Sequence, residues 1–389
     1  MNLAQLYSLT SGQKIDRIHV YEKFYPLPFE DYVVIQPWSK VAKNYTYHKE
    51  VIDILLPIFQ KANLKLVQVG GPNEPPLAGC YHTQGSTNFG QLEYIISKAK
   101  LVISTDSVSS HLAGHYDKPL VVLISNNFSQ CVRPYFGNKS KQIVLEPDRT
   151  KKNPSFAFDE GAKKQIDEIK PELIAESVCS LLGIDFNYRY KSVCFGDTYH
   201  NLTIESVPNQ AVDLKTLGID SVIMRMDYHF DERYLSQQLQ TGKCTIVTNK
   251  PIDLNLLRNF KPNIKELVYI LDGNHDPKFA AAVQSLGINC PMLSELSDEY
   301  VSSIKMDYMD LGVIHLKRGS KPKAVEGINI DKLYYRSKKY TLSNGRIFPS
   351  KAAYLHNLPI DNFDVNFCKT IDDPEFWKEE EYFYFLTEC

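Results

Sequence analysis

Short apolar segments with the period of a β-strand alternate with segments that have the period of an amphipathic helix. This alternation limits the possible folds more than any other feature of the chain. Residues 32–36 (YVVIQ) have the pattern of a buried strand, and residues 48–61 have that of a helix with one apolar side. Residues 171–182 predict a helix with proline in its first turn and Gly183 at its end. Strands that alternate with helices predict parallel β-α-β units and an α/β fold.

The same alternation restarts after Tyr190. The strand candidates of this second region are 221–226, 244–248, 267–271 and 311–315. The helix candidates between them are 231–240, 277–286 and 294–304. We therefore predict two Rossmann-like α/β domains, residues 1–186 and 187–316, followed by an extension over residues 317–389.

The extension differs in pattern from both domains. Asn344-Gly345 lies between two short strand patterns at 340–342 and 346–348, which predicts a β-hairpin. An acidic, aromatic segment that begins at Asp373 predicts a last helix to about Leu386.

Composition places the chain among globular proteins and excludes a global attraction to polyanions. Hydrophobic residues make up 43% and charged residues 23%, and the formal net charge is −2. The eight cysteines are scattered without metal-type spacing, so we expect neither a metal site nor a cofactor. There is no signal-peptide pattern, and the most apolar short run, residues 120–124, is too short to span a bilayer. We expect a cytoplasmic protein.

Three polar loops follow strands of the first domain. The first carries Ser39 and Lys43, the second Gly70 and Gly71, and the third the residues Thr105, Asp106, Ser107, Ser110 and His111. The carboxyl ends of parallel strands share one edge, where helix N-termini offer free N–H groups to an anion. The sequence thus predicts a phosphate site with Lys43 as its cation. Simple helix capping by the third loop remains an alternative.

These loops resemble the bacterial heptosyltransferase family of glycosyltransferases. The resemblance covers residues 30–183 and rests on QPWS…K at 36–43, VQVGGPNE at 67–74 and DSVSSHLAGHYDKPLVVLIS at 106–125. It implies a GT-B-like fold whose first domain holds a nucleotide-diphosphate sugar, with Ser39, Lys43, Asp106, Ser107 and His111 as donor-site residues. Val108 stands where the family usually has glycine. In that family the acceptor lobe precedes the donor lobe, whereas here the second α/β domain follows the donor-like one. We therefore expect a permuted order of lobes. The chain could be a viral member of the family that acts in the host cytoplasm.

Sugar transfer needs a group that takes the acceptor's proton. Three aspartates of the second domain are candidates for this group. Asp227 and Asp272 follow apolar strand patterns, and Asp197 lies in a polar cluster. Asp227 is the first choice because it directly follows a strand, although any of these positions could be an ordinary turn.

The extension is locally basic. Residues 317–351 contain ten Lys or Arg residues against two acidic ones, interleaved with aromatic residues. The acceptor-binding candidates are Arg318, Lys338, Lys339 and Arg346. Such a surface suits an anionic glycan or a nucleic acid, and it is also typical of a solvated face.

The predicted function is transfer of a sugar from a nucleotide diphosphate to a hydroxyl, on a glycan such as a lipopolysaccharide or on a hydroxymethylated DNA base. A sugar-nucleotide epimerase of the same fold and a non-catalytic nucleotide-sugar binding protein are the alternatives.

Overall fold

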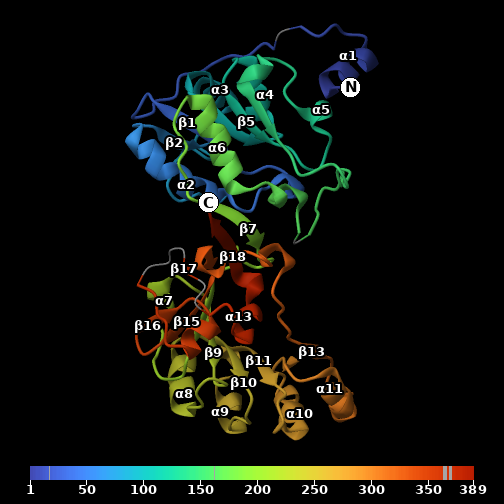
Figure 1. Cartoon of the computed structure of the whole chain (residues 1–389), viewed down its shortest axis with the longest axis vertical. Helices are drawn as coiled ribbons and strands as arrows, with labels where there is room; N and C mark the ends of the chain where they lie inside the picture. Colours follow the sequence, from blue (N-terminus) through green and yellow to red (C-terminus); the bar gives the residue numbers. More distant parts are fainter. Residues whose placement is uncertain (17, 162, 362–365, 368–369) are drawn as a thin grey trace. The chain divides into compact units, whose positions relative to one another are not determined.

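The computed structural model describes residues 1–16, 18–161, 163–361, 366–367 and 370–389. The chain forms two compact units, unit 1 (Met1–Ser192) and unit 2 (Val193–Cys389). The predicted α/β class is confirmed, because each unit contains a parallel sheet with helices packed on it (Figure 1). The division falls a few residues after the predicted limit at 186, and residues 317–389 lie in the same compact unit as the region before them.

Unit 1 contains a six-stranded parallel sheet with the order β3-β2-β1-β4-β5-β6. Its strands are β1 (Tyr32–Gln36), β2 (Lys65–Gln68), β3 (Tyr81–His82), β4 (Leu101–Thr105), β5 (Leu120–Leu123) and β6 (Gln142–Leu145). This is the Rossmann order, in which strand addition reverses direction between β1 and β4. Val34 is in register with Val67 of β2 and Val102 of β4, so the carboxyl ends of these three strands lie at one edge.

Helices cover both faces of this sheet. They are α2 (His48–Lys61), α3 (Phe89–Lys98), α4 (Val108–His115) and α6 (Pro171–Leu182). Unit 1 also contains α1 (Leu3–Ser11), which has no buried residue, and the short α5 (Ser129–Val132). On α2, Val51, Ile52, Leu55 and Phe59 are buried, which is the predicted apolar side. The helix predicted after residue 170 is confirmed: its first residue is proline, and Gly183 ends it in the left-handed conformation (φ 67°).

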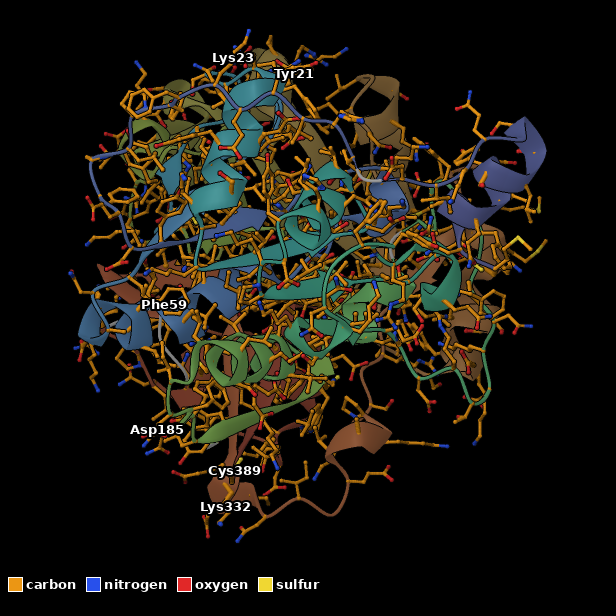
Figure 2. All side chains as sticks on the ribbon, turned by 90° about the horizontal axis from the view of Figure 1, so that it is seen from above. Tyr21, Lys23, Phe59, Asp185, Lys332 and Cys389 are labelled. Atoms are coloured by element: carbon orange, nitrogen blue, oxygen red, sulfur yellow. The ribbon has the colours of Figure 1, made fainter. Side chains whose placement is uncertain are left out.

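The segment before β1 lies along α3. Lys23 N donates to Gly90 O (2.9 Å) in the first turn of that helix, and the neighbouring Tyr21 side chain is exposed (Figure 2). A Cβ atom on Gly90 would lie 2.5 Å from Tyr21 O, so glycine allows this close approach.

Unit 2 contains a larger sheet with the order β13-β12-β11-β10-β9-β8-β15-β16. Its strands are β8 (Thr203–Ser206), β9 (Ser221–Arg225), β10 (Lys243–Thr248), β11 (Ile264–Ile270), β12 (Met292–Ser294), β13 (Ile314–Leu316), β15 (Lys339–Ser343) and β16 (Arg346–Phe348). Strands β8 to β13 are added in one direction, so right-handed crossovers place the helices between them on one face. Figure 1 shows α8 to α11 in a row along one side of this sheet.

The helices of unit 2 are short. They are α7 (Leu214–Leu217), α8 (Glu232–Thr241), α9 (Leu254–Asn259), α10 (Pro277–Ser285), α11 (Asp298–Ile304), α12 (Lys351–Leu355) and α13 (Pro374–Trp377). Alternate residues of β9 and β10, such as Met224 and Ile246, pack against Leu235 and Leu239 of α8 in one apolar core. No helix in the described ranges is long and apolar enough to cross a bilayer.

The predicted hairpin of the extension is confirmed. Strands β15 and β16 are antiparallel, and Asn344 (φ 48°) and Gly345 (φ 72°) form the turn between them. Strand β15 also pairs in parallel with β8, which joins the extension to the sheet of unit 2.

The predicted C-terminal helix is wrong beyond Trp377, where α13 ends. Residues 383–388 form strand β18, which lies between β14 (Leu333–Ser337) and β7 (Tyr190–Phe195) in a second sheet of order β17-β14-β18-β7, with β17 at Asn366–Phe367. The run Phe383 to Leu386 is buried on both sides. Such a run favours a central strand, and its partners are too far along the chain for local periodicity to reveal.

Candidate functional site

The carboxyl ends of β1 and β4 are joined by a glutamine side chain. Gln36 ends β1, and its Oε1 accepts from Ser107 Oγ (2.6 Å) and from Ser109 N (3.3 Å) at the start of α4. The two strands are neighbours at the point where strand order reverses, which is where open α/β sheets bind ligands. Gln36 therefore fixes the loop after β4 against the end of β1.

A pocket of about 260 Å³ lies at this edge. It is bounded by the ends of β1 and β2 and by the first turns of α3 and α4. The lining residues are Gln36, Val69, Gly70, Gly71, Thr87, Asn88, Phe89, Leu92, Val108 and Ser109. Two helix N-termini that border one pocket favour an anionic ligand, because their unpaired N–H groups carry partial positive charge.

Gly70 and Gly71, both predicted donor-site residues, lie in the turn after β2 and line the pocket. Gly70 has φ 156°, and a Cβ atom there would lie 1.8 Å from Glu74 Oε2. Within the described part of the chain, this buried Glu74 oxygen has no hydrogen-bond partner. Burial raises the pKa of Glu74, against a smaller opposite effect of a hydrogen bond from the Gly71 backbone.

Lys43 and His111 converge on one carboxylate. Lys43 Nζ donates to Asp106 Oδ2 and to Asp106 O (3.1 Å), and His111 Nε2 lies 3.6 Å from Asp106 Oδ1. Lys43 ends the short 3-10 helix Val41–Lys43 after β1, and Asp106 follows β4. The predicted convergence of the first and third loops thus has a definite geometry, with Asp106 between the two basic side chains.

The charge state of Asp106 follows from this arrangement. Burial acts to raise its pKa, but hydrogen bonds from His111 and Lys43 and the charges of both groups outweigh burial, so the pKa lies below its usual value. Asp106 is therefore ionised at neutral pH and holds the Lys43 ammonium beside the loop after β4. Because an ammonium carries three N–H groups, Lys43 can keep Asp106 and still donate to a ligand.

The other predicted donor residues are placed differently. Ser39 is exposed, and its backbone N–H donates to Asn44 Oδ1 (2.7 Å). Thr105 and Ser110 are fully buried, and Ser110 Oγ donates to Ser107 O (2.7 Å). The Ser110 contact helps to hold the loop after β4, whereas Thr105 Oγ1 has no hydrogen-bond partner within the described ranges. The buried Ser109 hydroxyl, on the pocket wall, has no hydrogen-bond partner among the described residues.

In unit 2, Asp227 lies at the end of β9, as predicted, but its carboxylate is occupied. Oδ1 accepts from Arg225 Nε (2.8 Å) and Oδ2 from Arg225 Nη2 (2.6 Å). Arg225 also donates through Nη1 to Glu205 Oε1 (2.7 Å), and its guanidinium lies 3.8 Å from the centre of the Tyr228 ring. A carboxylate held at both oxygens by a buried guanidinium is a poor proton acceptor. The structure thus gives Asp227 a role in orienting Arg225.

Lys339 belongs to the same buried group of charges, which contradicts its prediction as a surface residue for the acceptor. Its side chain is 4% exposed, and Nζ lies 3.0 Å from Glu205 Oε1 and 2.8 Å from Glu379 Oε1. The sequence could not reveal this burial, because the two glutamates are 134 residues before and 40 residues after it. We call Glu205, Arg225, Asp227, Lys339 and Glu379 the buried charge cluster.

The other predicted acceptor residues remain near the surface. Arg318 Nη2 lies 3.0 Å from Asp298 Oδ1, and Lys338 Nζ lies 5.5 Å from the centre of the Tyr199 ring. Arg346 is exposed, and its Nη1 donates to Asn357 Oδ1 (3.4 Å). The four candidates therefore do not form one surface.

Asp272, at the end of β11, has a different environment from Asp227. Oδ2 accepts from Asn249 Nδ2 (3.0 Å) and Oδ1 from Asn274 N (2.8 Å). Among the described residues it has no cationic partner within ion-pair distance. His275 Nδ1 lies 2.8 Å from Asp272 O, so the imidazole contacts the backbone carbonyl of Asp272. Asp197 is exposed in the loop after β7 and not at the end of a parallel strand.

Two residues of the unit 1 site were not chosen from the sequence, Gln36 and Glu74. Gln36 carried a usable signal, since it is the one polar residue at the end of an otherwise apolar strand. Glu74 follows a Gly-Gly-Pro turn, but only the fold shows that its carboxylate lies against Gly70. The described residues contain no group of three or more His, Cys, Asp or Glu side chains placed to hold a metal ion.

Residues 32–159 match the family model of glycosyltransferase family 9 (heptosyltransferase). The match includes the pocket, Lys43, Asp106 and His111, and it ends before unit 2 begins. No curated protein gave a significant match to the chain. The predicted order of lobes and the viral source are not tested by this match and stay predictions.

Solved structures with partial likeness include two glycosyltransferases. A family 9 glycosyl transferase from Veillonella parvula is 19% identical, with 46% of this chain and 50% of that chain covered and a TM-score of 0.33. The E. coli ADP-heptose lps heptosyltransferase II is 17% identical, with the same coverage and a TM-score of 0.30. This chain thus spans about half the length of both, and TM-scores this low carry no functional argument.

Proposed function

We propose that this protein transfers a sugar from a nucleotide-diphosphate sugar to a hydroxyl of a glycan. The observation that carries the proposal is the convergence of Lys43 and His111 on Asp106, beside the pocket at the strand-order reversal of unit 1. The match of residues 32–159 to a glycosyltransferase family supports it independently of that geometry.

In this proposal the donor lies across the carboxyl edge of unit 1. Gly70 and Gly71 line the pocket without side chains, and Glu74 Oε2, which lies against Gly70, offers an oxygen to a ligand hydroxyl. The diphosphate lies near the first turn of α4, where Lys43 supplies positive charge and His111 supplies an imidazole N–H group. Ser109 Oγ, which lacks a protein partner in the described ranges, donates to the same ligand.

Transfer requires that charge be stabilised as it develops. The acceptor oxygen forms a bond to the anomeric carbon, the bond from that carbon to the terminal phosphate oxygen breaks, and the nucleoside diphosphate leaves with the bonding pair. Lys43 and His111 stabilise the negative charge on this leaving group. Asp106 keeps both side chains in place before the donor binds, so little reorganisation is needed.

The acceptor's proton needs a base, and we propose Asp272. Among the described residues, its carboxylate accepts only from neutral amide groups, Asn249 Nδ2 and Asn274 N, and it remains partly exposed. The carboxylate of Asp227, by contrast, is held by Arg225. Asp272 also lies at the carboxyl edge of a parallel sheet, the edge that presents side chains to ligands.

Replacing Lys43 by alanine is expected to raise the dissociation constant of the bound nucleoside diphosphate about ten- to a hundred-fold. The reason is the loss of one charge-assisted hydrogen bond, which contributes about 1.5–3 kcal/mol. Titration calorimetry with ADP, UDP and GDP measures the change. Lys40→Ala is the matched control, because Lys40 is exposed on the same loop and we expect an unchanged affinity.

The proposed function is tested by thermal shift with ADP-, UDP- and GDP-sugars, followed by incubation of the stabilising donor with oligosaccharides. A ligand that binds only the folded state raises the melting temperature. Nucleoside diphosphate released only with an oligosaccharide present supports transfer. Conversion of the donor sugar without an acceptor would instead indicate an epimerase. Equal donor binding by the wild type, Lys43→Ala and His111→Ala contradicts the proposed donor site.

A further inference from the structure

Unit 2 has a pocket of its own, of about 420 Å³, outside the residues matched by the family model. A volume of this size is typical of small-molecule sites. The lining residues are Asn209, Ser343, Asn344, Arg346, Phe348, Tyr354 and Asn357. We call it the hairpin pocket, because four of these residues belong to the β15–β16 hairpin.

The hairpin pocket lies where the topology of the sheet favours ligand binding. Strands β9 to β13 are added on one side of β8, whereas β15 returns to its other side, so strand order reverses between β8 and β15. Both strands are parallel, with Leu342 in register with Ser206, and Ser343 and Asn209 follow at their carboxyl ends. In unit 1 the pocket likewise lies at the carboxyl ends of parallel strands, next to the first turn of the helix that follows β4, which agrees with the general rule for such sheets.

The polar wall of the hairpin pocket is built from neutral amides and a hydroxyl. Asn209 Nδ2 donates to Ser343 Oγ (2.8 Å), and Asn209 Oδ1 accepts from Asn344 N (3.2 Å). Gly345 N donates to Gln210 Oε1 (2.6 Å), so the turn is tied down at two points. Side-chain amides and hydroxyls both donate and accept, which matches the hydroxyl groups of a saccharide.

The apolar wall consists of two rings held by other rings. Tyr354 stacks on Tyr228 with centroids 5.3 Å apart and planes at 13°. Phe348 meets Tyr354 edge-on, with centroids 5.5 Å apart and planes at 84°. Rings fixed in this way present a preformed apolar surface to the C–H face of a sugar and lose little entropy on binding.

Arg346 adds a positive charge at the rim of the hairpin pocket. Its side chain is exposed and forms no ion pair within the described ranges, and its contact with Asn357 Oδ1 is long at 3.4 Å. A guanidinium binds carboxylate and phosphate groups through two parallel N–H donors. The charge therefore favours an acidic group on the ligand over a neutral one.

We propose that the hairpin pocket binds an acidic oligosaccharide, one that carries carboxylate or phosphate groups. Taking this saccharide as the acceptor rests on the function proposed above. Asp272 follows β11, three strands from β8, so the base lies about 14 Å along the sheet edge from the pocket. A bound acceptor must therefore be longer than a single sugar, with one part in the pocket and its reactive hydroxyl near Asp272.

The test is binding of the full-length protein to immobilised oligosaccharides that carry uronic acid, phosphate or neutral sugars only. We expect the acidic oligosaccharides to bind most tightly. Arg346→Gln should weaken their binding at least ten-fold and change binding of neutral oligosaccharides less than two-fold. Asn357→Gly keeps the left-handed backbone of this residue (φ 51°) and removes its amide, so it should weaken both classes. Arg318→Gln is the matched control, because it also removes one guanidinium, which pairs with Asp298 and does not line the hairpin pocket.

Each other outcome has a definite meaning. Absence of saccharide binding, or binding that none of the pocket variants alters, overturns the inference. Binding to duplex DNA that Arg346→Gln abolishes overturns it in favour of a nucleic acid. Donor binding, measured separately by thermal shift, should be unchanged in these variants. If saccharides bind but no nucleotide sugar does, the inference stands and the proposed transferase function fails.

Discussion

Replacing Glu205 by glutamine is expected to destabilise unit 2 by about 3–5 kcal/mol, because the change removes one partner from a buried set of charges. Glu205 is 2% exposed and faces both Arg225 and Lys339, which are 8% and 4% exposed. The substitution keeps the shape of the side chain but leaves two buried cations with less negative charge. Their desolvation is then no longer compensated.

The two tryptophans allow each unit to be followed separately. Trp38 lies in unit 1, and Trp377 is buried in unit 2 with Nε1 donating to Ile371 O (2.6 Å). In a Trp38→Phe background, urea unfolding followed by Trp377 fluorescence reports the free energy of unfolding of unit 2. Glu266→Gln on β11 is the matched control, because the Glu266 side chain has a single, long hydrogen bond among the described residues, from Asn289 Nδ2 (3.4 Å). We expect a change within about 0.5 kcal/mol for it.

A second variant tests the energetic coupling between Glu205 and Lys339. Lys339→Met alone should also destabilise unit 2, since Glu205 and Glu379 then lose a buried cation. In the double variant Glu205→Gln/Lys339→Met, the loss should be smaller than the sum of the two single losses. Additive losses would show that the buried charge cluster does not act as a unit.

The stability of unit 2 should also fall in acid. Burial acts to raise the pKa of Glu205, but the charges of Arg225 and Lys339 and their hydrogen bonds outweigh it and lower the pKa from 4.5 to about 2. A folded pKa below the unfolded one means that the contribution is complete above about pH 4.5 and is lost as the pH falls towards 2. Unfolding of unit 2 measured from pH 6 to pH 2.5 should show this loss. A Glu205→Gln slope equal to that of the wild type would contradict the assignment.

Asp272→Asn is expected to lower kcat for sugar transfer about 10²- to 10⁴-fold, the usual range for loss of a general base. The amide keeps the size of the side chain and can still meet Asn249, so the fold and donor binding should be unaffected. The measurement is the rate of nucleoside diphosphate release, with the donor and the acidic oligosaccharide found to bind. KM for the donor should stay within about two-fold, because the donor lies on unit 1 in this proposal.

Two comparisons separate a base from a structural residue. Asp276→Asn alters the residue that caps α10, where Asp276 Oδ1 accepts from Lys278 N (2.9 Å), and it should leave kcat near that of the wild type. If His275→Gln abolishes transfer while Asp272→Asn does not, the imidazole is the base and our assignment is wrong.

Much of unit 1 could be predicted because its signals are local. The apolar run at 32–36, the amphipathic pattern at 48–61 and Pro171 with Gly183 each predicted an element that the structure contains. Parallel topology predicted that the loops of Lys43 and Asp106 lie at one edge, since strand carboxyl ends share an edge, but the ion pair between the two residues was not predicted. Gln36 was missed because a residue that ends a strand gives no local sign of which loop it contacts.

Unit 2 was harder to predict, because its decisive contacts join distant segments. Asp227 was predicted as the catalytic base and Lys339 as an acceptor-binding residue, yet both belong to the buried charge cluster. The acidic segment after Asp373 looked helical, but residues 383–388 pair with β14 and β7 instead.

The sequence by itself determined which segments become strands and helices of the parallel sheets, and which polar loops of unit 1 lie at one edge. Periodicity and capping depend on neighbours a few residues apart, so they can be read locally. Only the tertiary structure decided which charged groups are buried, which carboxylate remains open to a ligand, and where the last strand pairs. Desolvation and sheet pairing depend on what distant segments cover, and no local pattern encodes that.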